Sequence, residues 1–450
     1  MANEIEDPIL LNRAHILLEK LALELQDLYL YRDLFFENHS IDMAKDKHKC
    51  VEERKESLLK NFERVNVETQ IPFSMRARFY YLEGRCYNVS IKYDARATQC
   101  LSKAVKLNPH LVEAWNELGE CYWKNINVKE AKACFEGALK HERNRITLRC
   151  LSIILRQEAA TKKEGDATQM ILKSVEFAKE AVSQDTKDGQ SWIILGNSYL
   201  CQYFTVLQDP AILKQCMSAY RQAYMDPVAR GQPDLYYNKA IALKYDEKYS
   251  EAIETFDQAC RLDPLWMPPD RERTKLRQFL ASAVDLLRTR GKIKCKRLAT
   301  MLQAVDKKML GDYQPGHIVS LGPKRAVLLE QVRIDALQEG SNEGKVILGR
   351  VVGSIHSENA VPFAFAIIDE SMKCMIVTAY NWAAGRGTLI GDWVAIPEPQ
   401  VSSHHVVTPE MTYTFKSIRI NNPMTLYVNG RRVERGQVAA TRVSSTYEMH

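Results

Sequence analysis

The chain contains a recurring pattern of aromatic, leucine, glycine and alanine residues that is clear in two places. In the first copy an aromatic residue lies three positions before a Leu-Gly pair, and a tyrosine follows the pair. An alanine, a phenylalanine and a second alanine come next, and the later copy repeats this half and adds a proline. The copies comprise Trp115, Leu118, Gly119, Tyr122, Ala131, Phe135 and Ala138, and then Ala252, Phe256, Ala259 and Pro264. Small residues at fixed positions among large ones indicate pairs of helices that cross closely.

This spacing is that of the tetratricopeptide repeat, a unit of about 34 residues that forms two helices. Stacked units have a concave face that usually binds a peptide. The chain has no P-loop, no dinucleotide-binding glycine motif, no Gly-x-Ser-x-Gly and no His-Glu-x-x-His. The pattern therefore predicts a peptide-recognition scaffold, not an enzyme.

Five units follow one another, and two of them are longer than usual. They start near Ala77, Val112, Arg145, Gly189 and Pro233. The third and fourth units span residues 145–188 and 189–232, about ten more than a normal unit. We expect the extra residues between the two helices of each unit, at 158–169 and 201–211. Matched insertions on one side of a stack often carry family-specific contacts.

The residues before and after the repeats predict helical caps. Residues 8–40 read as one long helix with a broad leucine stripe, and residues 41–65 as a second, charged helix. We therefore expect a cap or degenerate repeat over residues 1–76, and a solenoid over 77–290 that ends with a capping helix at 270–290. A Lys/Arg-rich run then predicts a basic linker over 291–313.

From about Gln314 the hydrophobic pattern changes from a helical to a strand period. Strand candidates occupy 326–332, 346–352, 363–369, 375–380, 393–397 and 424–428, with turn residues between them. Five or six strands in about 130 residues favour an oligonucleotide/oligosaccharide-binding (OB) barrel for residues 314–450, with a β-sandwich as the alternative. The predicted fold class is an α-solenoid followed by an OB-fold β-barrel.

Composition is that of an ordinary globular protein. The formal net charge is +6, and the acidic N-terminus argues against a signal or transit peptide. The 11 cysteines include no Cys-x-x-Cys pair, which favours reduced, buried thiols. No apolar run approaches the roughly 18 residues that would span a membrane.

Repeat register predicts which side chains line the concave groove. Positions 2, 5, 9 and 12 of the first helix of each unit share that face. A groove with both cations and anions suits a short peptide that carries adjacent opposite charges. The candidate peptide-binding residues are Trp123, Arg149, Arg156, Asn197, Asp234 and Tyr237.

A second candidate site lies in the basic run, at Lys292, Lys294, Lys296 and Arg297. The three lysines alternate with other residues, so in an extended segment they would point the same way. Such a cluster could neutralise RNA phosphates. The alternatives are a solvated basic joint or a nuclear-localisation signal.

The order of these parts resembles the tetratricopeptide repeat protein 5, or Strap, family, over nearly the whole chain. The sharpest stretches are residues 101–107, 112–119, 191–200, 349–352 and 389–399. The resemblance implies recognition of the N-terminal Met-Arg-Glu-type tetrapeptide of nascent tubulin at the ribosome exit tunnel. It further implies decay of tubulin mRNA through an adaptor and a deadenylase complex.

The same resemblance implies a second role, as a nuclear stress-response cofactor in the DNA damage response. Its partners would be acetyltransferase coactivators and an actin-nucleation cofactor, and its OB domain could bind DNA. The implied localisation is both cytoplasmic and nuclear, without a membrane partner.

Individual residues carry parts of this resemblance. It implies that Arg156 clamps the glutamate of the peptide, that Asp234 accepts from its arginine, and that Lys294 and Lys296 contact ribosomal RNA. An acidic residue expected just after Trp266 is replaced by Met-Pro-Pro in this chain.

Other ligand classes find less support in the sequence. The residues that a chaperone-type carboxylate clamp requires are absent from the first three units. His404 and His405 are expected in a loop without metal ligands at the right spacing, so we expect neither a metal nor a cofactor. The aromatic residues of the OB region, Phe363, Phe365, Tyr380 and Trp393, are expected in the core.

Overall fold

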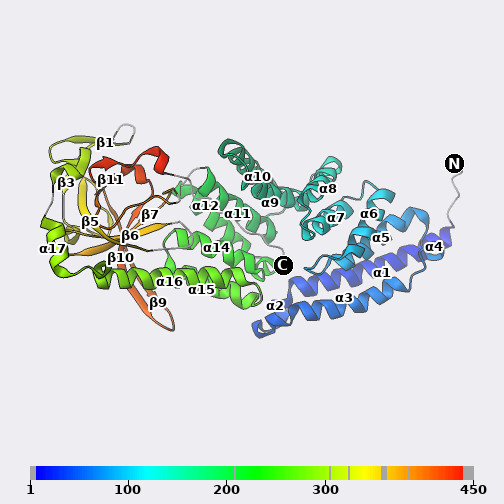
Figure 1. Cartoon of the computed structure of the whole chain (residues 1–450). Coiled ribbons are helices and arrows are strands. Elements are labelled where there is room, and N and C mark those ends of the chain that lie inside the picture. Colours follow the sequence, from blue (N-terminus) through cyan, green and yellow to red (C-terminus); the bar gives the residue numbers. More distant parts are fainter. Residues whose placement is uncertain are drawn as a thin grey trace. The chain divides into compact units, whose positions relative to one another are not determined.

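The computed structural model describes residues 7–206, 209–303, 306–322, 325–355, 362–383 and 385–438 (Figure 1). Within these ranges, no helix has both the length and the apolar character needed to cross a membrane. Contacts divide the chain into two units. The first contains the described residues up to Ala242 together with Thr255–Pro269, and the second contains Leu243–Glu254 and the described residues from Asp270 onward.

The first unit begins with a helical pair that precedes the repeats. Helix α1 (Pro8–Asp33) starts where the Asp7 side chain accepts a hydrogen bond from the Ile9 N–H, with a proline at the first helical position. The single helix expected over 8–40 instead ends at Asp33, and a separate turn, α2 (Phe35–Asn38), follows. The turn η1 (Ile41–Lys45) leads into α3 (Lys47–Glu63), and α4 (Val67–Gln70) leads to the first repeat.

Five helical pairs then form the repeats that the sequence predicted. The pairs are α5 (Phe73–Asn88) with α6 (Ala95–Leu107), α7 (Val112–Lys124) with α8 (Val128–His141), α9 (Arg145–Ala159) with α10 (Glu164–Gln184), α11 (Gly189–Thr205) with α12 (Pro210–Ala223), and α14 (Pro233–Tyr245) with α15 (Tyr249–Leu262). The short helix α13 (Pro227–Arg230) precedes the last pair.

The glycines of the repeat pattern lie at close helix crossings. A Cβ atom on Gly119 would be 2.7 Å from the Phe135 ring, and one on Gly196 would be 2.5 Å from the Tyr220 ring. Both distances are shorter than real carbon contacts, so only glycine allows the second helix to pack this closely. The spacing argument is therefore confirmed at the atomic level.

The insertions expected in the third and fourth repeats are not loops. Helix α9 runs to Ala159 and α10 already begins at Glu164. The additional residues extend α10 to 21 residues and α11 to 17. The prediction of inserted segments between the helices was therefore wrong. In the third repeat the extra residues mainly lengthen α10, and in the fourth they lengthen α11 and form the connection with α13 after α12.

Most of helix α16 (Met267–Thr289), which contains the helix expected to cap the solenoid, belongs to the second unit together with Leu243–Glu254. The residues expected to form a basic linker contain η2 (Arg290–Lys292), α17 (Cys295–Gln303) and η3 (Lys307–Tyr313). Leu298, Leu302, Leu310 and Tyr313 of this segment are buried.

The strands of the second unit form a hairpin and one large sheet. The hairpin pairs β1 (Ile318–Gly322) with β2 (Arg325–Leu328). The sheet has the order β12-β11-β8-β5-β6-β7-β10-β9-β4, and β3 pairs with β5. Its strands are β3 (Glu330–Gln331), β4 (Gly340–Ser341), β5 (Lys345–Ile355), β6 (Phe363–Ile368), β7 (Cys374–Ala379), β8 (Trp393–Pro397), β9 (Gln400–Val407), β10 (Thr412–Ile420), β11 (Tyr427–Val428) and β12 (Arg431–Arg432). Three short turns complete the unit: η4 (Ile334–Ala336), η5 (Pro423–Thr425) and η6 (Arg435–Gln437).

This sheet has the OB fold but is not closed. Strands β7 and β10 pair in parallel, while β5, β6 and β7 form an antiparallel meander. Over the described strands the sheet runs as an open path from β12 to β4, so the expected closed barrel is corrected to an open sheet. Val351, Phe365, Ile367, Val377 and Ile418 are among its buried core residues.

Five of the described strands were missed from the sequence: β1, β4, β12 and the two longest of the five, β9 and β10. β9 and β10 cover residues 400–407 and 412–420, and along most of each strand buried side chains alternate with exposed or partly exposed ones. The His404-His405 pair, expected in a loop, therefore lies within β9. His404 is buried and its Nε2 atom is 2.8 Å from the Ser417 hydroxyl oxygen, so its role is structural.

Candidate peptide-binding site in the repeat groove

Arg156 is a buried cation near the end of α9. The residue is only 7% exposed. Its Nη1 atom donates to the Ile194 carbonyl oxygen and to the Ser198 hydroxyl of α11, both at 3.3 Å. Its Nε atom is buried and has no hydrogen-bond partner within the described ranges. Burial lowers the pKa of Arg156 from its ordinary value, although nearby Asp234 opposes this effect. In the part of the chain that the structure describes, no carboxylate forms an ion pair with this guanidinium.

Asp234 lies at the start of α14, two repeats further along. Burial raises the pKa of its carboxyl group to about 6, and backbone N–H groups of Leu235 and Asp234 itself and the charge of Arg156 act in the opposite direction. Its position in the first turn of a helix also favours the carboxylate form. Arg156 and Asp234 therefore interact electrostatically without a direct contact.

Asn197 of α11 lies at the candidate site and is fully buried. Its Oδ1 atom accepts a hydrogen bond of 2.8 Å from the Tyr220 hydroxyl, and its Nδ2 group has no partner among the described residues. Asn238 of α14 is also buried, and its Nδ2 donates to the Asp234 carbonyl oxygen at 3.0 Å. The Asn238 Oδ1 atom is buried and has no hydrogen-bond partner in the part of the chain that the structure describes. Buried polar atoms without partners are uncommon in native proteins. Three of those among the described residues occur on α9, α11 and α14, and others lie elsewhere, for example at Arg85 and Thr388.

The other three predicted residues have structural partners. Arg149 forms an ion pair of 2.6 Å with Asp188, so its charge is neutralised inside the repeat stack. Trp123 packs against the core formed by Ala131, Phe135, Leu151 and Ile154. The Tyr237 ring is buried, with ring centroids 6.0 Å from Phe256 and 5.2 Å from Trp266.

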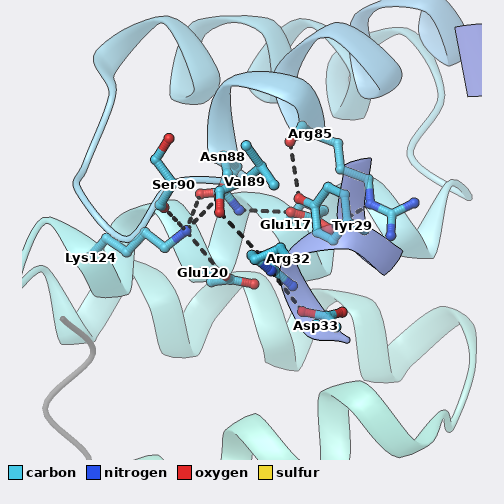
Figure 2. Close-up of polar contacts among 10 residues, drawn as sticks. All are labelled: Tyr29, Arg32, Asp33, Arg85, Asn88, Val89, Ser90, Glu117, Glu120 and Lys124. Carbon is cyan, nitrogen blue, oxygen red and sulfur yellow. Dashed lines mark hydrogen bonds and ion pairs between the residues drawn. The ribbon is translucent and has the colours of Figure 1, made fainter. Parts of the chain in front are cut away.

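The first helices of the preceding repeats carry a paired polar network (Figure 2). Figure 2 shows its residues converging from α1, α5 and α7. The Lys124 Nζ atom donates to the Asn88 carbonyl oxygen at 2.6 Å and to the Ser90 carbonyl oxygen at 2.9 Å, and it forms an ion pair of 3.0 Å with Glu120. Every cation of this network has a carboxylate partner, in contrast to Arg156.

Residues near the C-terminal end of α1 also belong to this network. The Arg32 guanidinium is paired with Asp33 and also donates to the Val89 carbonyl oxygen at 3.2 Å. The Tyr29 hydroxyl donates to the Arg85 carbonyl oxygen at 3.0 Å. Arg85 in turn lies 3.1 Å from a Glu117 oxygen. These contacts join the N-terminal pair to the first two repeats, which the sequence pattern did not predict.

The pKa values of Glu117 and Glu120 in this network shift in opposite directions. Burial and the neighbouring Glu120 raise the pKa of Glu117 from its ordinary value. Burial also acts to raise the pKa of Glu120, but Lys124 and the nearby arginines outweigh it and lower that pKa. The charges of the network therefore balance, although the Arg85 Nε atom, 3.1 Å from a Glu117 oxygen, is buried without a hydrogen-bond partner among the described residues.

The basic residues of the second unit are exposed, but the segment is not extended. Lys292, Lys294, Lys296 and Arg297 all have exposed side chains. Lys292 ends a 3-10 turn and Lys296 lies in the first turn of α17, so the expected alternation along a strand-like segment was wrong. The four cations nevertheless occur within one short stretch of surface-exposed chain.

The OB domain offers few exposed aromatic residues for base stacking. Phe365, Tyr380 and Trp393 are buried, as expected from the sequence, and Phe363 is partly buried against Trp382. Arg419 holds its guanidinium 4.1 Å from the Tyr380 ring centroid and donates to the Tyr245 carbonyl oxygen at 2.6 Å. These side chains contribute to packing within the second unit.

Comparison with known proteins agrees with a fold of tetratricopeptide repeats followed by an OB domain. Residues 328–442 match the family model described as the tetratricopeptide repeat protein 5 OB fold domain, and residues 112–144 and 233–264 match the tetratricopeptide repeat. Tetratricopeptide repeat protein 5 of Homo sapiens is 42% identical over 430 residues, which cover 95% of this chain and 96% of the relative. The chain belongs to the tetratricopeptide repeat protein 5 family. The Mus musculus relative is 41% identical over 446 residues and covers 99% of both chains.

Among solved structures, the chain is similar to the crystal structure of the APC/C hetero-tetramer Cut9-Hcn1. The TM-score is 0.42 and the identity 15%, over 64% of this chain and 53% of that one. Family membership supports an adaptor that carries tetratricopeptide repeats and an OB domain.

Proposed function

We propose that this protein is a non-enzymatic adaptor whose repeat groove recognises the N-terminal Met-Arg-Glu-type motif of nascent tubulin. The observation that carries the proposal is the buried guanidinium of Arg156, which has no carboxylate partner among the described residues. A buried and unpaired charge destabilises a folded protein unless a ligand supplies the opposite charge. A glutamate side chain would form a charge-assisted, bidentate pair with it.

Asp234 supports recognition of the arginine in the Met-Arg-Glu-type motif. Its carboxyl group has a raised pKa because it is buried, and a ligand cation would stabilise its ionised form. The groove therefore presents one cation and one anion, in separate repeats, to a peptide that carries both charges. An arginine next to a glutamate in the peptide fits this arrangement.

The exposed basic segment supports anchoring at the ribosome. Lys294 and Lys296 are exposed and carry no ion pair within the described ranges, so they are available to RNA phosphates. In this proposal, the protein is held at the exit tunnel while the groove reads the emerging chain. Recruitment of a deadenylase complex would then couple recognition to decay of the tubulin mRNA.

Titration of a fluorescent Met-Arg-Glu-type peptide into the purified protein tests this proposal. We expect saturable binding by the wild-type protein and a loss of at least about 100-fold in affinity for Arg156→Met, because a desolvated charge pair is removed. Arg149→Met is the matched control, since Arg149 is already paired with Asp188. Equal affinity of the Arg156→Met variant would contradict the proposal.

A further inference from the structure

Helix α1 carries a row of aliphatic side chains that face solvent. The row consists of Ile9, Ile16, Leu23 and Leu30, which are 63%, 61%, 61% and 45% exposed. Each lies seven residues after the one before it, and seven residues fall only about 20° short of two helical turns, so all four share one face. We call these four residues the heptad row. Single exposed apolar residues are ordinary, but a row at this spacing is the pattern by which one helix packs along another.

Charged residues follow one edge of the heptad row. Arg13, Lys20 and Asp27 each come four positions after a residue of the row, and all three are exposed. Lys20 forms an ion pair of 3.9 Å with Glu24 of the same helix. Among the described residues, neither Arg13 nor Asp27 has an ion-pair partner. One unpaired cation and one unpaired anion therefore lie on this edge, 14 residues apart.

The opposite edge carries no unpaired charge. It is formed by Asn12, Glu19 and Gln26, each three positions after a residue of the row. Glu19 forms an ion pair of 2.7 Å with Arg78 of α5, and the other two side chains are uncharged. Any charge complementarity between this face and a partner must therefore involve the first edge.

Asp27 lies in a surface cleft between α1 and α3. The cleft has a volume of about 350 Å³, and its charged lining consists of Glu24, Asp27 and Arg54. The Arg54 guanidinium lies 3.5 Å from the centroid of the Tyr31 ring, and the Asn61 side chain donates to a Glu24 oxygen at 2.9 Å. Two carboxylates and one guanidinium leave the cleft with a net negative charge, so it suits an additional cation beside Asp27.

We propose that the heptad row is a self-association surface, on which α1 of a second copy of this chain packs in the antiparallel direction. Placing Ile9 of one copy opposite Leu30 of the other also places Ile16 opposite Leu23. All eight aliphatic side chains of the two rows then leave water together in one seam. The inference does not depend on the proposed recognition of tubulin in the repeat groove.

The charges of the face indicate that the occupant is a second copy. A twofold axis between antiparallel helices brings the same edge of both faces together. In this register Arg13 of each copy lies opposite Asp27 of the other and enters the cleft beside it. At the centre, Lys20 and Glu19 each approach their own equivalents, but both are already paired within their chain. The face is therefore complementary to itself.

Parallel packing would not satisfy these charges. In a parallel pair, residues of the charged edge lie beside residues five positions earlier in the other helix. Arg13 would then lie beside Pro8, and Asp27 beside Ala22, so neither would meet an opposite charge. The antiparallel direction is the one that pairs both.

Sedimentation equilibrium of the full chain between about 1 and 200 µM tests the inference. We expect a dimer with a dissociation constant in the micromolar range, because a seam with one apolar residue per heptad is narrow. The variant Ile16→Ser with Leu23→Ser should raise this constant at least about 100-fold. Ile126→Ser with Met225→Ser is the matched control, since these residues of the same unit are 88% and 73% exposed. It should dimerise as the wild type does.

Charge reversal tests the direction of packing. Arg13→Asp and Asp27→Arg should each weaken dimerisation about 10-fold, because each places like charges opposite one another. The two changes combined should restore the dissociation constant to within about threefold of the wild type. Affinity for the Met-Arg-Glu-type peptide should be the same in all of these variants.

Three results would overturn the inference. A wild-type protein that stays monomeric over the whole concentration range would leave the heptad row to a helix of another protein. A dimer that persists in the Ile16→Ser, Leu23→Ser variant would form through a different surface. Failure of the combined charge reversal to restore dimerisation would exclude the antiparallel register.

Discussion

Arg156 of α9 and Asp234 of α14 are oppositely charged and lie within electrostatic range of each other, yet no ion pair joins them in the described structure. Both groups are removed from water, and each shifts in pKa in the direction that disfavours its charged form. Two buried charges kept apart cost folding free energy that a direct pair would partly recover. A ligand that carries both a negative and a positive charge would bridge Arg156 and Asp234.

Replacing Arg156 with methionine should stabilise the unliganded protein. The Ile194 carbonyl oxygen still accepts a hydrogen bond of 2.8 Å from the Ser198 hydroxyl, so the substitution leaves no orphaned acceptor there. We expect the free energy of unfolding to rise by about 1–2 kcal/mol, as when other buried charges are replaced by apolar side chains. Chemical denaturation followed by tryptophan fluorescence measures it, and a loss of stability of similar size would show that Arg156 is structural.

Peptide affinity should fall as the solution is acidified through pH 6. The carboxyl group of Asp234 has a pKa of about 6 in the free protein, and a peptide arginine would favour its ionised form. At pH 5 about one tenth of the free sites are ionised, so affinity should be about 10-fold lower than at pH 7.5. The glutamate of the peptide, with an ordinary pKa near 4.3, remains mostly ionised.

Asp234→Asn is the control for this pH dependence. The variant should bind the peptide weakly at every pH, with a flat profile between pH 7.5 and 5. Because the folded-state pKa of Asp234 lies above its unfolded value, this group also makes stability fall as the pH rises from about 4 to 6. The asparagine variant should lack that fall, and a wild-type pH profile in the variant would assign the titration to another group.

Lys124→Met should have the opposite effect to Arg156→Met. The side chain of Lys124 is only 5% exposed and has both a carboxylate partner and three carbonyl or amide oxygens as acceptors. Its loss should lower the free energy of unfolding by about 3 kcal/mol and leave peptide affinity in the folded protein unchanged. Lys129→Met, at an exposed position in the next helix, is the control and should change neither. Wild-type stability for Lys124→Met would mean that the network in Figure 2 contributes little.

Gly291→Ala should destabilise the second unit. The added Cβ atom would overlap the Val352 carbonyl oxygen, and the residue has a φ of 68°. Gly316→Ala provides a control for backbone strain alone, since its φ is 89° and no atom lies within 4 Å of the added Cβ. We expect about 1 kcal/mol for the control and at least about 2 kcal/mol more for Gly291→Ala, measured by thermal unfolding. Equal losses of stability for the two variants would show that β5 shifts easily to accept the added Cβ atom at residue 291.

The sequence predicted the repeats well because their spacing reflects a steric requirement. Gly119 and Phe135 lie at the positions the pattern assigned, and their contact explains why it recurs. The OB domain was predicted from its apolar strands. Strands β9 and β10 were missed because more than half of the residues in each are polar, so their hydrophobicity is no higher than that of a loop.

The candidate site was less predictable than the fold. Helical periodicity assigned Arg149 and Arg156 to one helix face, but it predicted neither how deeply these side chains are buried nor which residues they contact. The structure pairs Arg149 with Asp188, and no carboxylate among the described residues pairs with Arg156, through tertiary contacts that no local pattern encodes. Asn238, which has a buried amide oxygen without a partner, lies outside the positions that were considered.

The most direct test of the account is a double-mutant cycle between Arg156 and the acidic residue of the peptide. Affinities would be measured for the wild-type protein and Arg156→Met, each with a Met-Arg-Glu-type peptide and with the peptide whose glutamate is changed to glutamine. We predict a coupling of at least about 1.5 kcal/mol, so that either change alone removes most of the affinity and the second adds little. Additive losses, with no coupling, would contradict the claim that Arg156 binds the glutamate.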